Sequence, residues 1–141
     1  HLRNLTGEYA MAMVDIDEFK VINDIFGHPA GDMALYTVAQ TMRSLLRSND
    51  DIVRYGGDEF FILFNNMHED ALARKLEDIC EAVRALTFPD YPDLNVHTSI
   101  GGCYGSGRVS ELIQKADIAL YKAKKTRDCV IIYKEHSNDA D

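Results

Sequence analysis

The sequence lacks any apolar run long enough to cross a membrane, and it has no signal peptide. It also lacks a basic face, because 15 Lys and Arg stand against 23 Asp and Glu, for a formal net charge of -8. A chain without a basic surface does not offset the repulsion of nucleic-acid phosphates or anionic lipids. These absences argue against nucleic acid and direct membrane contact as partners of this chain.

Cysteine is scarce as well. The three cysteines, Cys80, Cys103 and Cys129, have spacings that fit neither a disulfide framework nor a zinc site. We therefore expect reduced thiols in a cytoplasmic domain. His97 has no acid or cysteine partner visible in the sequence, and we expect a histidine on the surface or on a sheet face. Because the chain begins with His1 rather than Met, we expect a fragment of a longer protein, whose membrane anchor, if it has one, lies outside this sequence.

The length of 141 residues and the 46% hydrophobic content suit one globular domain over residues 1–141. We expect an ordered core over about residues 8–134, a frayed start and a polar, disordered tail. Apolar periodicity predicts the strands and helices given in the next sentence, and Asp17 and Ser110 are expected to cap the first and the last of the helices. The strands are at 9–14, 52–55, 60–64, 94–102 and 130–133, and the helices at 17–25, 29–47, 72–86 and 109–124. This alternation predicts an α/β sandwich with a central mixed sheet flanked by helices.

Residues 54–60, Arg-Tyr-Gly-Gly-Asp-Glu-Phe, form the most informative stretch. A two-residue link, Gly56-Gly57, between two apolar strands predicts a tight hairpin turn with positive φ at the glycines. Asp58 and Glu59 then lie at the tip of the hairpin. The alternative is that they are two solvated loop acids.

A second acidic stretch makes the first more informative. Residues 14–17, Val-Asp-Ile-Asp, end the apolar run that predicts the first strand. If that strand pairs beside the hairpin, Asp15 and Asp58 converge. Two carboxylates brought together repel unless a cation lies between them, which favours a hard divalent ion with oxygen ligands, Mg²⁺ or Mn²⁺.

Together these residues resemble the GGDEF domain of diguanylate cyclases, which convert two GTP into the bacterial second messenger cyclic di-GMP and two pyrophosphates. The resemblance covers residues 9–133 and implies the nucleotidyl cyclase or polymerase palm fold. It rests on several spaced motifs in the same order as in the family. These are Asp15-Ile16-Asp17, Phe19-Lys20, Ile22-Asn23-Asp24, Gly27-His28, Gly31-Asp32, residues 54–60, Ala116-Asp117 and residues 119–124.

The resemblance implies a role for each matching acid. Asp15, the Ile16 carbonyl, Asp58 and Glu59 would hold the metal, and Asp58 or Glu59 would also take the proton of the attacking hydroxyl. The sequence does not separate base from ligand. Activity would require a second GGDEF domain, because each domain would hold a single GTP and two copies would face each other about a two-fold axis.

The guanine base would be held by Asn23 and Asp32. A carboxylate accepts hydrogen bonds from N1-H and the N2 amine of guanine, which adenine does not offer. The alternatives are that Asn23 caps the end of a helix and that Asp32 interacts with a helix dipole.

The phosphates would be bound by Phe19 and Lys20 at the start of the first helix, where backbone N-H groups are free. Lys124 and Arg127 match the Lys and Arg of the family's AKxxGRN phrase. Here the glycine is absent and Asp128 replaces the asparagine, so the loop is one residue shorter. The alternative for Lys20 is a solvated surface lysine.

Arg47 and Asp50 match the family's RxxD inhibitory site, which binds the product cyclic di-GMP. The alternative is an ordinary loop after a helix. For the whole domain, the leading alternative is a catalytically silent module that binds GTP or cyclic di-GMP as a regulatory signal. A cyclase of mixed adenine-guanine product is a weaker alternative, because Asp32 suits guanine. A metal-binding structural protein is weaker still, because it would not explain Asn23, Asp32 and Lys124 together.

Overall fold

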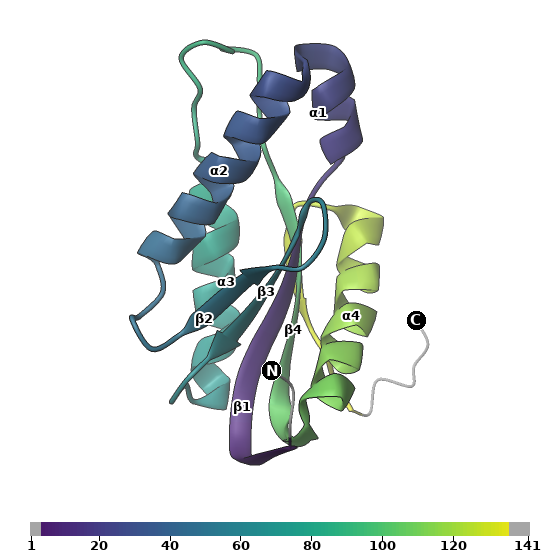
Figure 1. Ribbon diagram of the computed structural model, residues 1–141. Coiled ribbons are helices and arrows are strands. Elements are labelled where there is room, and N and C mark those ends of the chain that lie inside the picture. Colours follow the sequence, from purple (N-terminus) through teal and green to yellow (C-terminus); the bar gives the residue numbers. More distant parts are fainter. Residues whose placement is uncertain (1–3, 136–141) are drawn as a thin grey trace.

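The computed structural model describes residues 4–135, so the first three residues of the predicted frayed start and residues 136–141 of the predicted tail lie outside the described part. The core is a five-stranded sheet with the strand order β2-β3-β1-β4-β5 (Figure 1). Its strands are β1 (Asn4–Ile16), β2 (Asp51–Arg54), β3 (Glu59–Phe64), β4 (Thr98–Arg108) and β5 (Cys129–Ile132).

The sheet is mixed, as predicted. β1 pairs antiparallel with β3 on one side and β4 on the other, whereas β4 and β5 are parallel. β1 is central because its apolar run is buried on both faces, with Ala10, Met11, Ala12, Met13 and Val14 all 0% exposed. The central strand therefore delivers Asp15, its first acidic residue after the run, to a buried position.

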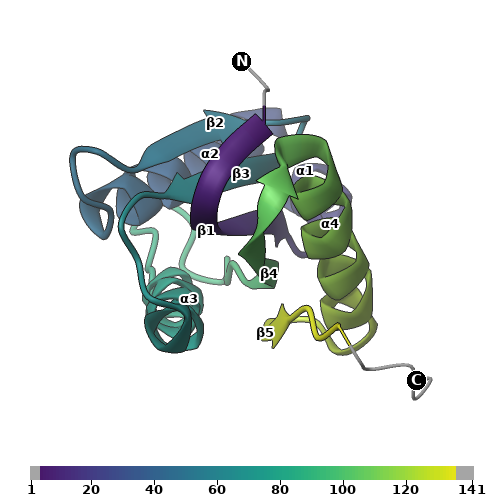
Figure 2. The same cartoon turned by 90° about the horizontal axis from the view of Figure 1, so that it is seen from below.

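Helices cover both faces of this sheet. They are α1 (Phe19–Phe26), α2 (His28–Ser44), α3 (Glu69–Arg84) and α4 (Val109–Thr126). α4 lies on one face, and α2 and α3 lie on the other (Figure 2). Alternate residues of β1 divide between the faces, so that Met11 and Met13 pack against α4 while Ala12 and Val14 pack against the other layer.

α4 approaches the sheet closely at Gly101. A Cβ atom placed on Gly101 would lie 2.2 Å from the backbone nitrogen of Leu120 and 2.3 Å from the carbonyl oxygen of Ala116. Only glycine allows this contact between helix backbone and strand. It fixes the height of α4, and therefore of Lys124 at its end, above the sheet.

Several predicted boundaries and caps were wrong. β1 begins at Asn4, so residues 4–7 belong to a strand rather than to a frayed start. β4 begins only at Thr98. The earlier start was predicted because Leu94 and Val96 alternate as in a strand, but they are buried from an irregular segment. The N-caps of α1 and α4 are Glu18 and Arg108, and neither helix has a side-chain cap, so Asp17 and Ser110 do not cap them.

Cys80, Cys103 and Cys129 are all free, as predicted, and none forms a disulfide. Burial raises the pKa of each thiol, that of Cys80 to about 11, which makes them poor nucleophiles. Within residues 4–135, no helix combines the length and the apolarity needed to cross a bilayer.

Candidate active site

The hairpin between β2 and β3 carries its acids as predicted, but its turn is different. The link takes in residues 55–58, and neither Gly56 nor Gly57 has positive φ, so the predicted two-residue turn was wrong. The tip is instead held by Arg54, whose Nε donates to the carbonyl oxygens of Gly56 at 3.2 Å and Gly57 at 3.0 Å. A side chain outside the turn therefore sets the turn geometry.

The structure brings the two acidic stretches together. Asp15 pairs with Glu59 in the register of β1 and β3, and the backbone nitrogen of Ile16 donates to the carbonyl oxygen of Asp58 at 3.1 Å. Asp15 is only 4% exposed. Its Oδ2 contacts the ammonium group of Lys124, whereas its Oδ1 is buried without a hydrogen-bond partner among the described residues.

The electrostatics of Asp15 follow from this setting. Burial raises the pKa of Asp15 to about 6, against the hydrogen bond from Lys124, which lowers it, while the neighbouring charge of Asp58 adds to the rise. The same contact raises the pKa of Lys124. The result is a buried carboxylate whose charge is only partly compensated, which is the electrostatic condition of a cation site.

A cavity of about 360 Å³ opens beside Asp15. It brings together most of the residues to which the family resemblance gives a role in binding metal or phosphate. Its lining consists of Asp15, Ile16, Asp17, Glu18, Phe19, Lys20, Asp58, Lys124 and Arg127. We call it the acid cavity. Glu59 is not part of the lining, since its carboxylate lies against the hairpin turn near Gly56.

The cations around the acid cavity are paired with acids. Lys124 contacts Asp15, and the guanidinium group of Arg127 lies 3.2 Å from Glu18. Lys20 pairs with Asp24 at 3.1 Å and its side chain is 87% exposed, so its contact in this structure matches the surface-lysine alternative. At the start of α1 no side chain caps the backbone N-H groups, which leaves them available to an anion in the cavity.

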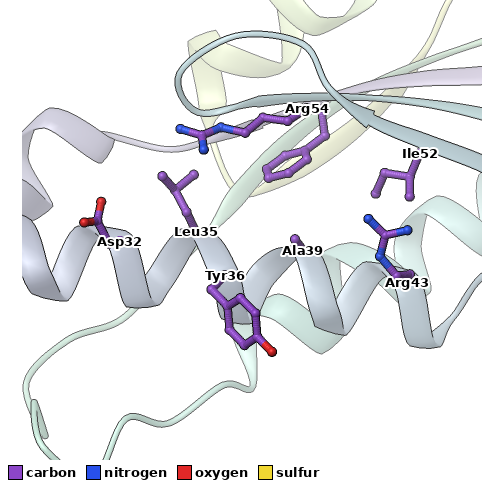
Figure 3. A pocket seen from close by; sticks show the side chains of 8 residues that line it. Asp32, Leu35, Tyr36, Ala39, Arg43, Ile52 and Arg54 are labelled. Atoms are coloured by element: carbon purple, nitrogen blue, oxygen red, sulfur yellow. The ribbon is translucent and has the colours of Figure 1, made fainter.

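The predicted guanine residues lie across the contact of α1 and α2. Asn23 Oδ1 is buried without a hydrogen-bond partner among the described residues, and it faces Gly31, where a Cβ atom would lie 1.8 Å away. Asp32 lies one residue further along α2. It lines a second cavity of about 340 Å³ between α2 and the hairpin, together with Leu35, Tyr36, Ala39, Arg43, Ile52, Arg54 and Phe60 (Figure 3).

The second cavity has charged side chains towards both ends, Asp32 and Arg54 at one and Arg43 at the other, with apolar residues between them (Figure 3). Arg54 extends from the hairpin towards the end of α2 that carries Asp32, and Leu35 lies between them (Figure 3). Asn23 does not line this cavity, so the structure puts the predicted guanine residues at neighbouring sites rather than on one wall.

The RxxD residues lie in the loop between α2 and β2, at the opposite end of β2 from the hairpin tip. The Asp50 side chain is 2% exposed, and its oxygens accept hydrogen bonds from the backbone nitrogens of Arg47 and Asn65, both at 2.9 Å. Arg47 Nη2 donates to the carbonyl oxygen of Asn65 at 2.5 Å, and the side chain is 54% exposed. Asp50 therefore shapes the loop, and Arg47 is the member that faces solvent.

Sequence reasoning missed several residues that form this region. Glu18 pairs with Arg127, and Arg54 holds the hairpin tip. His97 was expected to have no acid partner, but its Nδ1 lies 3.4 Å from Asp128. Of these residues, only Arg54 could have been found from the local sequence, because it lies just before the two turn glycines. The acid partner of His97 is distant in the sequence, so no local pattern indicates it.

A divalent ion is implied by the acids, and the donor set fits one. Within the described residues no three His, Cys, Asp or Glu side chains are arranged to hold a metal, which leaves Asp15 and Asp58. Mg²⁺ is commonly held by one or two carboxylates and completes its shell with waters and substrate phosphates. The buried, partnerless Oδ1 of Asp15 is the acceptor that such an ion would satisfy.

A five-stranded mixed sheet, two helical layers and paired carboxylates at a hairpin tip define a nucleotidyl cyclase palm-like domain. A family profile described as "Diguanylate cyclase, GGDEF domain" matches residues 2–128. The chain belongs to the GGDEF domain family.

Relatives and solved structures agree with this assignment. Probable diguanylate cyclase DgcC of Escherichia coli strain K12 is 34% identical over 118 residues, covering 82% of this chain and 32% of DgcC. Diguanylate cyclase DosC of the same organism is 39% identical over 127 residues, covering 86% of this chain and 28% of DosC. This chain thus spans about a third of the length of these curated relatives.

Among solved structures, the active GGEEF domain of a diguanylate cyclase from Vibrio cholerae superposes with a TM-score of 0.84 at 30% identity, covering 91% of this chain and 84% of that one. The GGDEF domain of DgcB from Caulobacter crescentus, in complex with c-di-GMP, superposes with a TM-score of 0.83 at 28% identity, covering 89% and 78%. The predicted fold is therefore confirmed.

Proposed function

We propose that this domain is one half of a diguanylate cyclase, which binds GTP with a divalent ion and joins it to the GTP of a second copy. The product is cyclic di-GMP, and two pyrophosphates are released. The observation that carries the proposal is the buried Asp15, with one partnerless oxygen, beside Asp58 in a cavity that also holds Lys124 and Arg127. The family and the names of the relatives support the same activity.

Asp15, the Ile16 carbonyl and Asp58 are the groups that would hold Mg²⁺ or Mn²⁺, with Glu59 nearby. The ion supplies charge neutralisation on the phosphates and lowers the pKa of the attacking hydroxyl. The 3'-hydroxyl oxygen of one GTP bonds to the α-phosphorus of the other, the bond to the β-phosphate oxygen breaks, and pyrophosphate leaves. The hydroxyl proton passes to Asp58 or Glu59, and the same exchange in the opposite direction closes the ring.

The phosphates would lie in the acid cavity. The backbone N-H groups at the start of α1, including those of Phe19 and Lys20, have no side-chain cap. They would bind an anion at the positive end of the helix dipole. Arg127 and Lys124 would exchange their present partners, Glu18 and Asp15, for phosphate oxygens. The chain's own acids thus hold these cations in the cavity before the nucleotide arrives.

The guanine base would reach Asn23 and Asp32 from the acid cavity. Asn23 offers a buried acceptor with no partner in the described part of the chain, and Asp32 is exposed and lines the second cavity. Both are acceptors suited to the N1-H and N2 amine of guanine. Two domains are required, since each would present a single GTP.

Product inhibition would act through Arg47 and Asp50. Because Asp50 already accepts two backbone hydrogen bonds, Arg47 would make the direct contact with the cyclic dinucleotide, and Asp50 would hold its loop.

The proposal is tested by incubating the protein with GTP and Mg²⁺ over a range of protein concentrations and separating the products by chromatography. We expect cyclic di-GMP, with a specific rate that rises with protein concentration because two domains must meet. Asp58→Ala should abolish product, while Asp51→Asn, an exposed acid at the far end of β2, should leave the rate unchanged.

Undiminished product from Asp58→Ala would refute the site. Binding of GTP or cyclic di-GMP by wild-type protein without any turnover would support the alternative of a silent regulatory module. That alternative has one structural observation in its favour, the pairing of all three candidate phosphate-binding cations, Lys20, Lys124 and Arg127, with acids.

A further inference from the structure

The connection between α4 and β5 holds two consecutive residues in the left-handed region. Arg127 has φ 66° and Asp128 has φ 52°. Residues with a Cβ atom adopt such angles at an energetic cost, so the surrounding contacts must maintain them. The family's AKxxGRN phrase has a glycine in this loop, and this chain has none.

Asp128 is hydrogen-bonded to two distant segments of the chain and lies close to a third. Its backbone N-H donates to Asp17 Oδ2 at 2.8 Å, at the end of β1. Its two carboxylate oxygens share the single Nε-H of Arg84 on α3 in one bifurcated hydrogen bond, at 3.1 and 3.0 Å. His97 Nδ1, just before β4, lies 3.4 Å from the same carboxylate.

The contacts continue towards the sheet. Asp17 Oδ1 accepts a hydrogen bond from Ser99 Oγ at 2.5 Å, which fixes the carboxylate that holds Asp128. Burial raises the pKa of Asp128, but the hydrogen bond from Arg84 and the charge of His97 outweigh it, so the pKa lies below its usual value. The carboxylate is therefore ionised at neutral pH and the pair with Arg84 is charged.

This network has a direct consequence for the acid cavity. Arg127 precedes Asp128 and its guanidinium group lies 3.2 Å from Glu18, on the cavity wall. A change of the φ angle at Asp128 would change the direction of the backbone at Arg127 and move the Arg127 side chain. Arg84 itself does not line the cavity.

We propose that Arg84 and Asp128 are positioning residues, which replace the family's loop glycine by clamping the left-handed connection so that Arg127 points into the acid cavity. The inference rests on the proposed function, because it takes the triphosphate of GTP as the group that Arg127 meets. It assigns a role in nucleotide binding to a residue of α3, outside both cavities.

The test measures binding of a fluorescent, non-hydrolysable GTP analogue with Mg²⁺ to Arg84→Met, with Arg74→Met as the matched control on the exposed face of the same helix. We expect Arg84→Met to weaken binding about tenfold, the effect of one lost charge-assisted hydrogen bond, and Arg74→Met to change it less than about twofold. Adding Asp128→Gly to Arg84→Met should restore affinity, because glycine adopts positive φ freely.

A double-mutant cycle with Arg127→Met separates positioning from general stability. We expect Arg84→Met to have no further effect once Arg127 is gone. Equal weakening in both backgrounds, or no rescue by glycine, would overturn the proposal.

A second readout needs no nucleotide. The Nε-Hε resonance of Arg127 in an NMR spectrum should shift in Arg84→Met and stay in place in Arg74→Met. If the wild-type protein fails to bind GTP, the proposed function fails, and this resonance still decides whether Arg84 positions Arg127. An unmoved resonance in Arg84→Met would contradict the clamp.

Discussion

Asp15 and Asp50 are both buried carboxylates, and they differ in what their oxygens contact. Each oxygen of Asp50 accepts a backbone hydrogen bond, so the side chain completes a loop. Asp15 has one oxygen on Lys124 and one without a partner in the described chain. Burial without full compensation is costly, and it persists where a ligand supplies the missing contact. The comparison indicates that Asp50 serves the fold, and it supports the proposal that Asp15 serves a ligand.

The strongest way to break this comparison is Asp15→Asn. We expect cyclic di-GMP synthesis to fall by about 1,000-fold, the scale observed when an electrostatic element of an active site is removed. The melting temperature should not fall, because burial costs the Asp15 charge more than its contact with Lys124 returns, as its raised pKa indicates. Turnover and thermal unfolding are measured on the same preparation. Loss of both activity and stability would make Asp15 a structural residue like Asp50.

The complementary change is Asp50→Asn. The amide group places a donor where the carboxylate accepted a backbone N-H, so we expect a loss of about 1–3 kcal/mol in the free energy of unfolding. Urea unfolding measures it, and Asp51→Asn on the exposed neighbour serves as the control. Equal stability of the two variants would show that the hydrogen bonds of Asp50 contribute little.

A smaller effect is expected for Arg47→Ala. The exposed guanidinium group is the member of the RxxD pair that is accessible to a ligand, so its removal should raise the cyclic di-GMP concentration for half-inhibition about tenfold. Turnover is followed against added cyclic di-GMP. Identical inhibition curves for wild type and variant would count against an inhibitory site here.

The smallest effect is the pH dependence of the stability that the ion pair of Asp128 with Arg84 contributes. The pKa of Asp128 is 3.8 in the unfolded chain and lower in the folded protein, so its stabilising effect is complete above pH 3.8 and is lost as pH falls through the folded pKa. Its side chain is 33% exposed, which limits the effect to below about 1 kcal/mol through solvent screening.

Asp128→Asn isolates this contribution, because asparagine tolerates the left-handed conformation. The difference in melting temperature between wild type and Asp128→Asn should be larger at pH 7 than at pH 3. A difference that stays constant between these pH values would rule out the carboxylate charge as its source.

The sequence was sufficient for the parts that depend on local pattern. The apolar run before Asp15 predicts a buried strand, and its acidic end would meet the hairpin tip if the two paired, which β1 and β3 do. The mixed sheet followed from the alternation of elements. Lys124 and Arg127 were predicted to lie at the same site from resemblance, and both line the acid cavity.

The features that the sequence did not predict depend on contacts between segments that are distant in the chain. The hairpin turn was predicted from its glycines, but Arg54 sets its shape through their carbonyl groups. Asp17 has a local reading as a helix cap, yet its carboxylate bonds to the backbone of Asp128, separated from it by 111 positions. No local periodicity records such a pairing, because it forms only when α4 and β5 close the sheet.

The most direct test of the shared metal site is calorimetric titration of a non-hydrolysable GTP analogue into wild type and Asp15→Asn, each with Mg²⁺ and with EDTA. We expect tight binding to wild type in Mg²⁺, weak binding in EDTA, and weak binding to Asp15→Asn in both. Equal affinity of wild type and variant in Mg²⁺ would contradict the assignment of Asp15 to the ion that holds the triphosphate.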